Sequence, residues 1–324
     1  MIEAKNQIEM LQAQNKIYNK HKNNFKYSEL LNQPIVFKYL CGLTVEQFSL
    51  LLNSVQPYTH LIPYPDCKNN SNRRLIDLPT ELLSVLTTCR HGLNQVMSYI
   101  LNISKSTTQR IFIGWVIFLS TILNEIDLKP ESGFFVKKMP KSFIETEHGL
   151  TDLIIDATEF KFQSASNFEL NSLMFSNYKN TQTGKALIGI APHGGGILFS
   201  DIYPGSISDS DLTEKSDTIL FVEKDHEIMS DRGFSIQEFC ATKGITLYRP
   251  KQKDSDQFSQ VDVARNFDIA STRIHVERYI MGRIWDWGIM NTVWPINRMD
   301  LLSSTRQMLA HIVNLTMPPI GPKK

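Results

Sequence analysis

The sequence predicts an α/β protein in which a mixed five-stranded sheet with helices follows an all-α region. Up to about residue 126, apolar residues recur at the spacing of helices. From residue 151 the pattern becomes that of strands, in short apolar runs separated by turn residues. The chain has 324 residues, 42% hydrophobic and 21% charged, which suits one large globular domain or two ordinary ones.

Composition excludes several classes of protein. The formal net charge is +1, so any binding of nucleic acid must come from local basic patches. The four cysteines lie far apart and form no CxxC pair, so we expect reduced, buried thiols rather than a zinc finger. The lysine-rich first thirty residues lack the apolar core of a signal peptide. The apolar stretch 111–126 is interrupted by polar residues, so we expect a buried helix and no membrane partner.

The first part of the chain is expected to be a mobile arm, residues 1–33, followed by a helical region, residues 34–130. Lys, Gln and Asn dominate the arm. Thr44 followed by Gln47 is typical of a helix N-terminus closed by a capping box. A further helix is expected from Leu78-Pro79 to His91-Gly92, with Pro in its first turn and Gly at its end.

A helix-turn-helix is predicted at about residues 75–125. A helix over 94–101, a turn capped by Ser104 and a helix over 105–124 follow one another closely. The second helix opens with polar residues that suit DNA phosphates or base edges; the DNA-binding candidates are Ser106, Thr107, Gln109 and Arg110. The alternative is a plain helical subdomain in which the Ser and Thr residues only cap helices.

Residues 131–150 are expected to be a linker, 151–315 the α/β domain and 316–324 a tail. The expected strands are 153–162, 185–191, 197–203, 226–230 and 245–248, with helices after 206, over 236–242 and over 261–283. Three strands in a meander, then alternating helices and strands, are typical of a ribonuclease-H-like domain. In that architecture the first and fourth strands are neighbours, which would bring Asp156 beside Asp231.

Three carboxylates are candidate metal ligands in this arrangement: Asp156 and Asp231 at strand ends, and Glu277 on the late helix that crosses the sheet. Hard oxygen ligands of this kind hold two Mg²⁺ or Mn²⁺ ions roughly 3.5–4 Å apart in two-metal phosphodiester chemistry. Each acid alone has a simpler interpretation: the aspartates in turns, and Glu277 in an i,i+4 ion pair with Arg273. Their joint placement favours the metal site.

Five runs carry a resemblance to a known family: IIDATE (154–159), SNYK (176–179), GSISD (205–209), MSDRGF (229–234) and RIHVER (273–278). Together they resemble the DDE endonuclease domain of PIF/Harbinger-type and related eukaryotic transposases, over about residues 150–315. The segment 75–125 resembles the helix-turn-helix that precedes this domain in such proteins. The resemblance implies that Asp156, Asp231 and Glu277 form the metal-binding triad.

The resemblance also implies roles for basic residues. Arg273 resembles an arginine that these families place beside the last acid, where it holds a phosphate or orients Glu277. Lys179, Arg249 and Lys251 are candidate contacts to the DNA backbone. Where relatives carry lysine in a GRIK-like run, this chain reads Gly-Arg-Ile-Trp, so Arg283 is the candidate substitute. Ser208 or Asp209 is expected to cap the helix after residue 206. Asp209, in the GSISD run, is the ambiguous acid; Asp231 is preferred because it ends a strand beside Asp156, whereas Asp209 opens a helix and is satisfied there as an N-cap.

The predicted function is that of a transposase-derived endonuclease that hydrolyses element ends and transfers strands to target DNA, as a homo-oligomer in the nucleus. The zinc module often attached to relatives is not expected here, so end recognition rests on the helix-turn-helix or on a DNA-binding partner, which would also supply import from the cytoplasm. The alternatives are a domesticated DNA-binding protein, a nuclease that only hydrolyses, and an unrelated α/β protein. Trp285, Trp287 and Trp294 are expected to pack rather than stack on bases.

Overall fold

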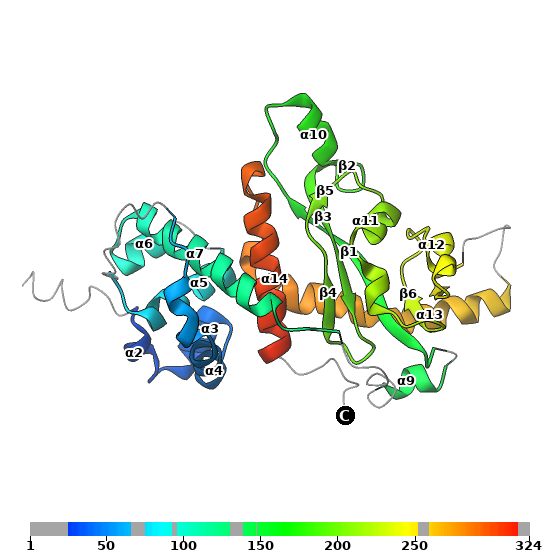
Figure 1. Cartoon of the computed structure of the whole chain (residues 1–324), viewed down its shortest axis with the longest axis horizontal. Helices are drawn as coiled ribbons and strands as arrows, with labels where there is room; N and C mark the ends of the chain where they lie inside the picture. Colours follow the sequence, from blue (N-terminus) through cyan, green and yellow to red (C-terminus); the bar gives the residue numbers. More distant parts are fainter. Residues whose placement is uncertain are drawn as a thin grey trace, which may run out of the picture. The chain divides into compact units, whose positions relative to one another are not determined.

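The computed structural model describes residues 25–65, 75–92, 96–129, 139–146, 148–251 and 259–316. The chain divides into two compact units, with the boundary between Phe118 and Leu119 inside helix α7. Figure 1 shows the elements of each unit. Residues 1–24 of the predicted arm, residues 131–138 and 147 of the predicted linker, and the predicted tail apart from Thr316 lie outside the described residues.

The first unit is all-helical. Its elements are α2 (Tyr27–Leu30), α3 (Pro34–Cys41), α4 (Val45–Val55), the 3-10 helix η1 (Gln56–Leu61), α5 (Leu78–His91), α6 (Val96–Leu101) and the start of α7 (Lys105–Asn124). The capping box at Thr44 and Gln47 is present, and Gly92 ends α5 in the left-handed conformation. The predicted end of the mobile arm at residue 33 is wrong. Helix α2 already packs on the first unit, where Leu30 is buried and Tyr27 stacks on Phe48.

The core of the first unit explains the most apolar stretch of the sequence. α7 is long and apolar enough to cross a membrane by length and composition, but 56% of its most apolar window is buried. Trp115 on α7 is fully buried, and its Nε1–H donates to the buried carboxylate of Glu81 at 2.9 Å. Tyr64 donates to the same carboxylate oxygen at 2.6 Å. A buried acid with two donors is the satisfied arrangement expected of a core helix.

The second unit contains the predicted mixed sheet, but among the described residues the sheet has seven strands where five were expected. Its strands are β1 (Thr151–Lys161), β2 (Phe175–Ser176), β3 (Thr181–Ile190), β4 (Gly196–Phe199), β5 (Tyr203–Pro204), β6 (Glu227–Met229) and β7 (Thr246–Tyr248). The order is β2-β3-β1-β6-β7, with β4 and β5 also pairing with β3. β1 pairs antiparallel with β3 and parallel with β6. The predicted neighbourhood of the first and fourth strands is therefore confirmed, and with it the ribonuclease-H-like fold class.

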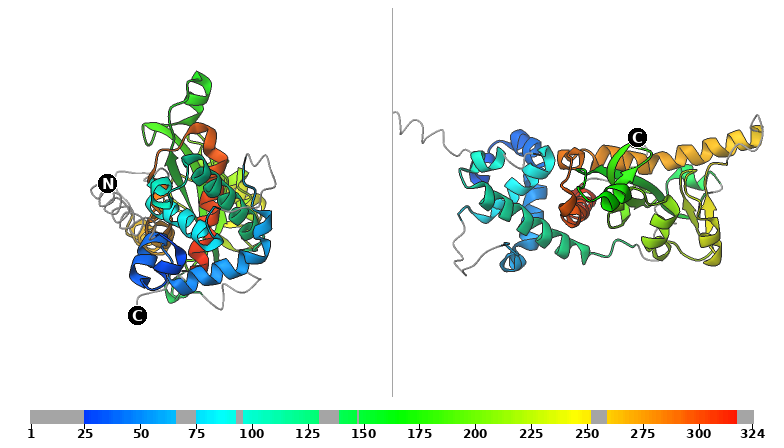
Figure 2. Two further views of the ribbon diagram at one scale, coloured as in Figure 1. Left: turned by 90° about the vertical axis from the view of Figure 1, so that its left-hand side faces the viewer. Right: turned by 90° about the horizontal axis from the view of Figure 1, so that it is seen from above.

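Helices cover both faces of this sheet. The helices of the second unit are α9 (Lys141–Ile144), α10 (Phe168–Met174), α11 (Asp209–Lys215), the 3-10 helix η2 (Thr218–Phe221), α12 (Gln237–Thr242), α13 (Gln260–Tyr279), the π-helical turn η3 (Ile280–Ile284), the 3-10 helices η4 (Gly288–Asn291) and η5 (Ile296–Arg298), and α14 (Met299–Thr316). The right-hand view of Figure 2 shows the sheet between α13 on one side and α11 and α12 on the other. Because successive side chains of a strand point to opposite faces of the sheet, alternate residues of β1 face either α13 or α11 and α12.

Side-chain alternation along β1 decides which residues meet which helices. Leu153 and Ile155 pack in one cluster with Leu212 of α11 and Cys240 of α12. Residues of even number, Asp156 among them, therefore face the α13 side. On that side, Thr272 of α13 contacts the sulfur of Met229 on β6 at 3.6 Å. Asp156 and α13 are thus on the same face of the sheet.

Candidate active site

Asp156 lies in the middle of a long strand. The apolar core of β1 ends at Ile155, but β1 continues past Asp156 to Lys161 and pairs with β3 over that distance. The expectation that Asp156 stands at a strand end is therefore wrong. On the other edge, β1 pairs with the short β6 only as far as Ile154 opposite Met229. The chain after β6 is thus free to turn beside Asp156.

Asp231 occupies that turn. Its Oδ1 accepts from the N–H of Arg232 at 2.7 Å, and its carbonyl accepts from Phe234 at 3.3 Å. Phe234 is buried in the core cluster beneath the turn. Arg249, after β7, donates from Nη1 to the carbonyls of Arg232 at 3.3 Å and Phe234 at 3.0 Å. The turn that carries Asp231 is therefore held by the core and by a guanidinium.

Glu277 lies on α13, which begins at the N-cap Ser259 and buries Ile269, Val276 and Tyr279 completely. Glu277 and Arg273 are four residues apart and so lie on one face of the helix. Arg273 Nη2 is 2.7 Å from Glu277 Oε1. Burial of the other face fixes the rotation of α13, which turns this pair toward Asp156.

The guanidinium of Arg273 joins all three predicted acids. Its Nη1 lies 3.9 Å from Asp156 Oδ1, and its Nη2 lies 3.8 Å from Asp231 Oδ1. The Arg273 side chain is only 14% exposed, and Nη1 makes no hydrogen bond with the described residues. One positive charge therefore stands among three carboxylates.

The electrostatics of Asp156 reflect this crowding. Burial raises the pKa of the Asp156 carboxyl from 3.8 to about 6; Arg273 lowers that pKa, while Asp231 and Glu277 raise it. The distances of 3.9, 3.8 and 2.7 Å from the Arg273 guanidinium to Asp156, Asp231 and Glu277 place both neighbouring acids close to Asp156. The ionised form of Asp156 is disfavoured in this protein, and a nearby cation of higher charge than Arg273 would favour it.

The three acids suit a divalent ion by their chemistry. They supply the hard oxygen atoms that Mg²⁺ and Mn²⁺ prefer. Among the residues that the structure describes, however, no three His, Cys, Asp or Glu side chains are grouped as metal ligands, since Arg273 lies between the acids. To hold an ion together, the acids must exchange Arg273 for it.

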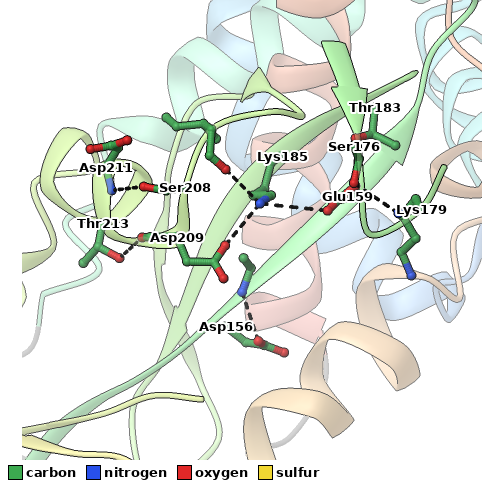
Figure 3. A network of polar contacts seen from close by, with 12 residues as sticks. Asp156, Glu159, Ser176, Lys179, Thr183, Lys185, Ser208, Asp209, Asp211 and Thr213 are labelled. Carbon is green, nitrogen blue, oxygen red and sulfur yellow. Dashed lines mark hydrogen bonds and ion pairs between the residues drawn. The ribbon is translucent and has the colours of Figure 1, made fainter. Parts of the chain in front are cut away.

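Asp209 belongs to a different cluster, shown in Figure 3. Its Oδ1 is 3.2 Å from Lys185 Nζ on β3. The N-cap of α11 is Ser208, whose Oγ accepts from the N–H of Asp211, so the expectation that Asp209 is the N-cap is wrong. Lys185 lies opposite Glu159 in the β1–β3 register, on the face of the sheet away from Asp156. Asp156 has no contact in this cluster and bonds to the N–H of Ala157 instead.

The predicted DNA contacts in the second unit fall into two groups. Lys179 is exposed, with its Nζ 4.6 Å from the centre of the Tyr178 ring, and Lys251 is exposed and pairs with Asp262 at 3.2 Å. Arg249 is used within the protein, on the carbonyls of the Asp231 turn. Arg283 is half-buried in the π-helical turn, with its guanidinium over the Tyr279 ring. Lys179 and Lys251 are thus the more accessible pair.

In the first unit, the predicted DNA contacts lie at the start of α7. Ser104 caps the helix by accepting from the N–H of Thr107 at 3.1 Å, and its Oγ is also 2.9 Å from that of Ser106. Ser106 and Gln109 are exposed, whereas Thr107 and Arg110 are half-buried. Ser106 and Gln109 are therefore the most accessible of the four.

Sequence reasoning missed the roles of Lys185 and Glu159, since both read as ordinary strand residues. The signal that would have found them is the register of β1 and β3, which no local pattern states. The tryptophans pack as expected: Trp287 and Trp294 are buried, and Trp285 stacks on Phe160 with ring centres 5.4 Å apart.

The fold and the site together define a class. Within a ribonuclease-H-like fold, one acid lies on a central strand, one on the turn after its parallel neighbour and one on a helix that crosses the sheet. A model of the DDE superfamily endonuclease family matches residues 155–317, a span that contains all three acids. The chain belongs to this family. No curated protein and no solved structure matches it significantly.

Proposed function

We propose that this protein is a transposase-derived endonuclease of the PIF/Harbinger type that cuts DNA and joins the cut strand to a target. The family supports the transposase-like nuclease domain, and the convergence of Asp156, Asp231 and Glu277 on Arg273 is the observation that carries the proposal. In this proposal Asp156, Asp231 and Glu277 would hold two Mg²⁺ or Mn²⁺ ions.

The chain's own groups have distinct roles in this reaction. Bound divalent ions supply an activated water or 3′-hydroxyl and stabilise the leaving oxygen. Asp156 fixes the site on the rigid sheet, while Asp231 and Glu277 close it from the turn and from α13. Arg273, once released from the acids, is placed to bind a phosphate of the substrate, because its guanidinium forms paired hydrogen bonds with phosphate oxygens.

DNA recognition is assigned to two surfaces. In the first unit, α6 and α7 would act as a helix-turn-helix, with Ser106 and Gln109 the accessible contacts and Thr107 and Arg110 beside them. In the second unit, Lys179 and Lys251 would contact phosphates, which position DNA without reading its sequence. Element ends and target DNA are the expected partners, bound by a homo-oligomer in the nucleus, with or without a separate DNA-binding protein.

The test is nicking of supercoiled DNA with Mg²⁺ or Mn²⁺. We expect wild type to nick, and Asp156→Asn, Asp231→Asn and Glu277→Gln each to reduce nicking at least about a hundredfold, since each removes an ionic ligand. Asp211→Asn, an exposed acid of α11, is the matched control and should nick like wild type. Joined products with a pre-cut 3′ end would support strand transfer, and hydrolysis alone would limit the function to cleavage.

One observation favours a second candidate, a domesticated DNA-binding protein without transposition. The ion pairs of Arg273 satisfy the acids in the absence of metal, as they would in a domain that has no further use for metal. If wild type neither nicks DNA nor is stabilised by Mn²⁺, while still binding duplex DNA, this second candidate replaces the first.

A further inference from the structure

The cluster around Lys185 is a second polar network beside the candidate active site. Lys185 Nζ donates to the carbonyl of Ile207 at 2.9 Å and to Asp209 Oδ1 at 3.2 Å, and lies 4.0 Å from Glu159 Oε1. Thr183 donates to the other oxygen of Glu159 at 2.7 Å. Figure 3 shows Lys185 between the two acids. The network ties the loop before α11 to strands β1 and β3.

Burial makes this network more than a surface ion pair. The side chains of Lys185 and Glu159 are 13% and 7% exposed, and that of Asp209 is 29% exposed. Taking such charges out of water costs free energy, and apolar residues of similar size often stabilise a fold as well or better. Stability alone therefore does not account for the network. A buried charge pair does, however, fix the position of its members.

Asp209 is fixed directly against the turn that carries Asp231. A Cβ built on Gly233 would lie 3.1 Å from Asp209 Oδ2, so the carboxylate lies beside Gly233 and leaves only tight space for a side chain at position 233. The same turn is held from β7 by Arg249, whose Nη1 donates to the carbonyls of Arg232 and Phe234. The Asp209 carboxylate thus lies beside the exposed turn, and the Arg249 guanidinium bonds to the carbonyls of the turn.

We propose that Lys185 and Asp209 are positioning residues, which hold the Asp231 turn where Asp231 binds metal together with Asp156. The inference rests on the proposed function and assigns Asp209 a role outside the triad. Lys185 holds Asp209 by charge, the Asp209 carboxylate lies beside Gly233 and limits its movement, and Gly233 belongs to the backbone that follows Asp231. Residues that orient metal ligands typically change metal affinity by about 10–100-fold when replaced.

The experiment measures Mn²⁺ binding to the full-length protein by electron paramagnetic resonance. We expect Asp209→Asn and Lys185→Met each to raise the Kd for Mn²⁺ by about tenfold or more, and Lys185→Arg to restore most of the affinity. Asp211→Asn is the matched control, because Asp211 also lies in the first turn of α11 but is exposed. Saturating Mn²⁺ should restore nicking in Asp209→Asn, whereas Asp231→Asn should stay inactive.

Gly233→Ala provides a second test that leaves both charges intact. Its Cβ would lie 3.1 Å from Asp209 Oδ2, so Asp209 or the turn must shift by a few tenths of an ångström, and we expect weaker Mn²⁺ binding with little change in the melting temperature. Amide hydrogen exchange over residues 231–234 should quicken in Asp209→Asn and Gly233→Ala but not in Asp211→Asn.

The outcomes separate this inference from the proposed function. Unchanged exchange and unchanged Mn²⁺ affinity in Asp209→Asn and Gly233→Ala would overturn the positioning role, while wild-type nicking would leave the nuclease intact. Inactive Asp209→Asn at saturating Mn²⁺ would also overturn it, because Asp209 would then act as a ligand. Absence of Mn²⁺ binding by wild type would overturn the proposed function together with the inference.

Discussion

Arg273 and Glu277 form the shortest ion pair of the candidate site, with 2.7 Å between Nη2 and Oε1. The same guanidinium lies 3.9 Å from Asp156 and 3.8 Å from Asp231. It therefore neutralises part of the repulsion among three acids while no metal is bound. In the proposed function a bound divalent ion would take over that task, and the stability of the protein would then depend on both cations.

Replacing Arg273 by Met tests this exchange. Without metal at pH 8, we expect the free energy of unfolding to fall by about 1–3 kcal/mol, since three carboxylates lose their counter-charge in a partly buried site. Saturating Mn²⁺ should recover most of the loss, so the metal-induced shift of Tm should exceed that of wild type. Thermal unfolding with and without Mn²⁺ measures both values. Arg278→Met, an exposed arginine of the same helix, should behave like wild type, and an equal loss with and without Mn²⁺ would contradict the exchange.

Asp156 gives a prediction about pH. Because its pKa is raised from 3.8 to about 6, the folded protein keeps a proton that the unfolded chain has already released between these values. Its contribution to stability is therefore present below about pH 4 and is lost as the pH rises to about 6. We expect metal-free Asp156→Asn protein to be more stable than wild type at pH 7, by about 1–3 kcal/mol, and equal to it near pH 3.5. Denaturant unfolding across this range is the measurement, and a parallel pH dependence in the two proteins would exclude this role.

Arg249 was expected to contact DNA, but in the structure it bonds to the carbonyls of the Asp231 turn. Replacing it can distinguish these two roles. Arg249→Met should raise the Kd for Mn²⁺ by about tenfold, because the carbonyls of Arg232 and Phe234 lose their donor. The salt dependence of DNA binding by Arg249→Met should match that of wild type. Lys179→Met is the comparison: it should lower the slope of log K against log salt by about 1 and leave Mn²⁺ affinity unchanged. The reverse pattern would return Arg249 to the DNA contacts.

Substitutions of Trp285 can distinguish packing of its ring within the protein from stacking of the ring on a DNA base. The Trp285 ring stacks on Phe160, and its Nε1–H donates to Thr158 Oγ1 at 3.2 Å. Trp285→Phe should cost about 1 kcal/mol of stability through the lost hydrogen bond, and Trp285→Ala about 3 kcal/mol through the cavity. Binding of DNA by the folded variants should be unchanged, as measured by fluorescence anisotropy. A loss of affinity without a loss of stability would show that the ring contacts DNA.

The sequence predicted the fold where local signals decide it. The capping box at Thr44, the Gly92 stop and the strand cores are local patterns, and the order of strands and helices gave the parallel pairing of β1 with β6. The structure differs where pairing extends an element beyond its apolar core. β3 begins at Thr181, before the expected start at residue 185, because Thr181 and Gln182 pair with β2 and Thr183 and Gly184 pair with β1. Sequence periodicity does not report such cross-strand partners.

The candidate site was predictable as a set of acids but not as an electrostatic arrangement. Arg273 was expected to hold a phosphate or to orient Glu277, and its contact with all three acids depends on the rotation of α13. Asp209 was expected to cap α11, a role taken by Ser208, because the pairing of Asp209 with Lys185 spans 24 positions in the chain. Side-chain partners so far apart are set by strand register and not by spacing.

The three acids stand on three kinds of backbone. Asp156 lies in a strand paired with β3 from Ile154 to Lys161, whereas Asp231 lies on a turn and Glu277 on a helix. Asp156 is therefore the stationary reference of the site, and adaptation to a substrate must come from the other two acids moving relative to it. A redesign that aims to alter metal preference would do best to vary the turn and the helix, and to leave β1 untouched.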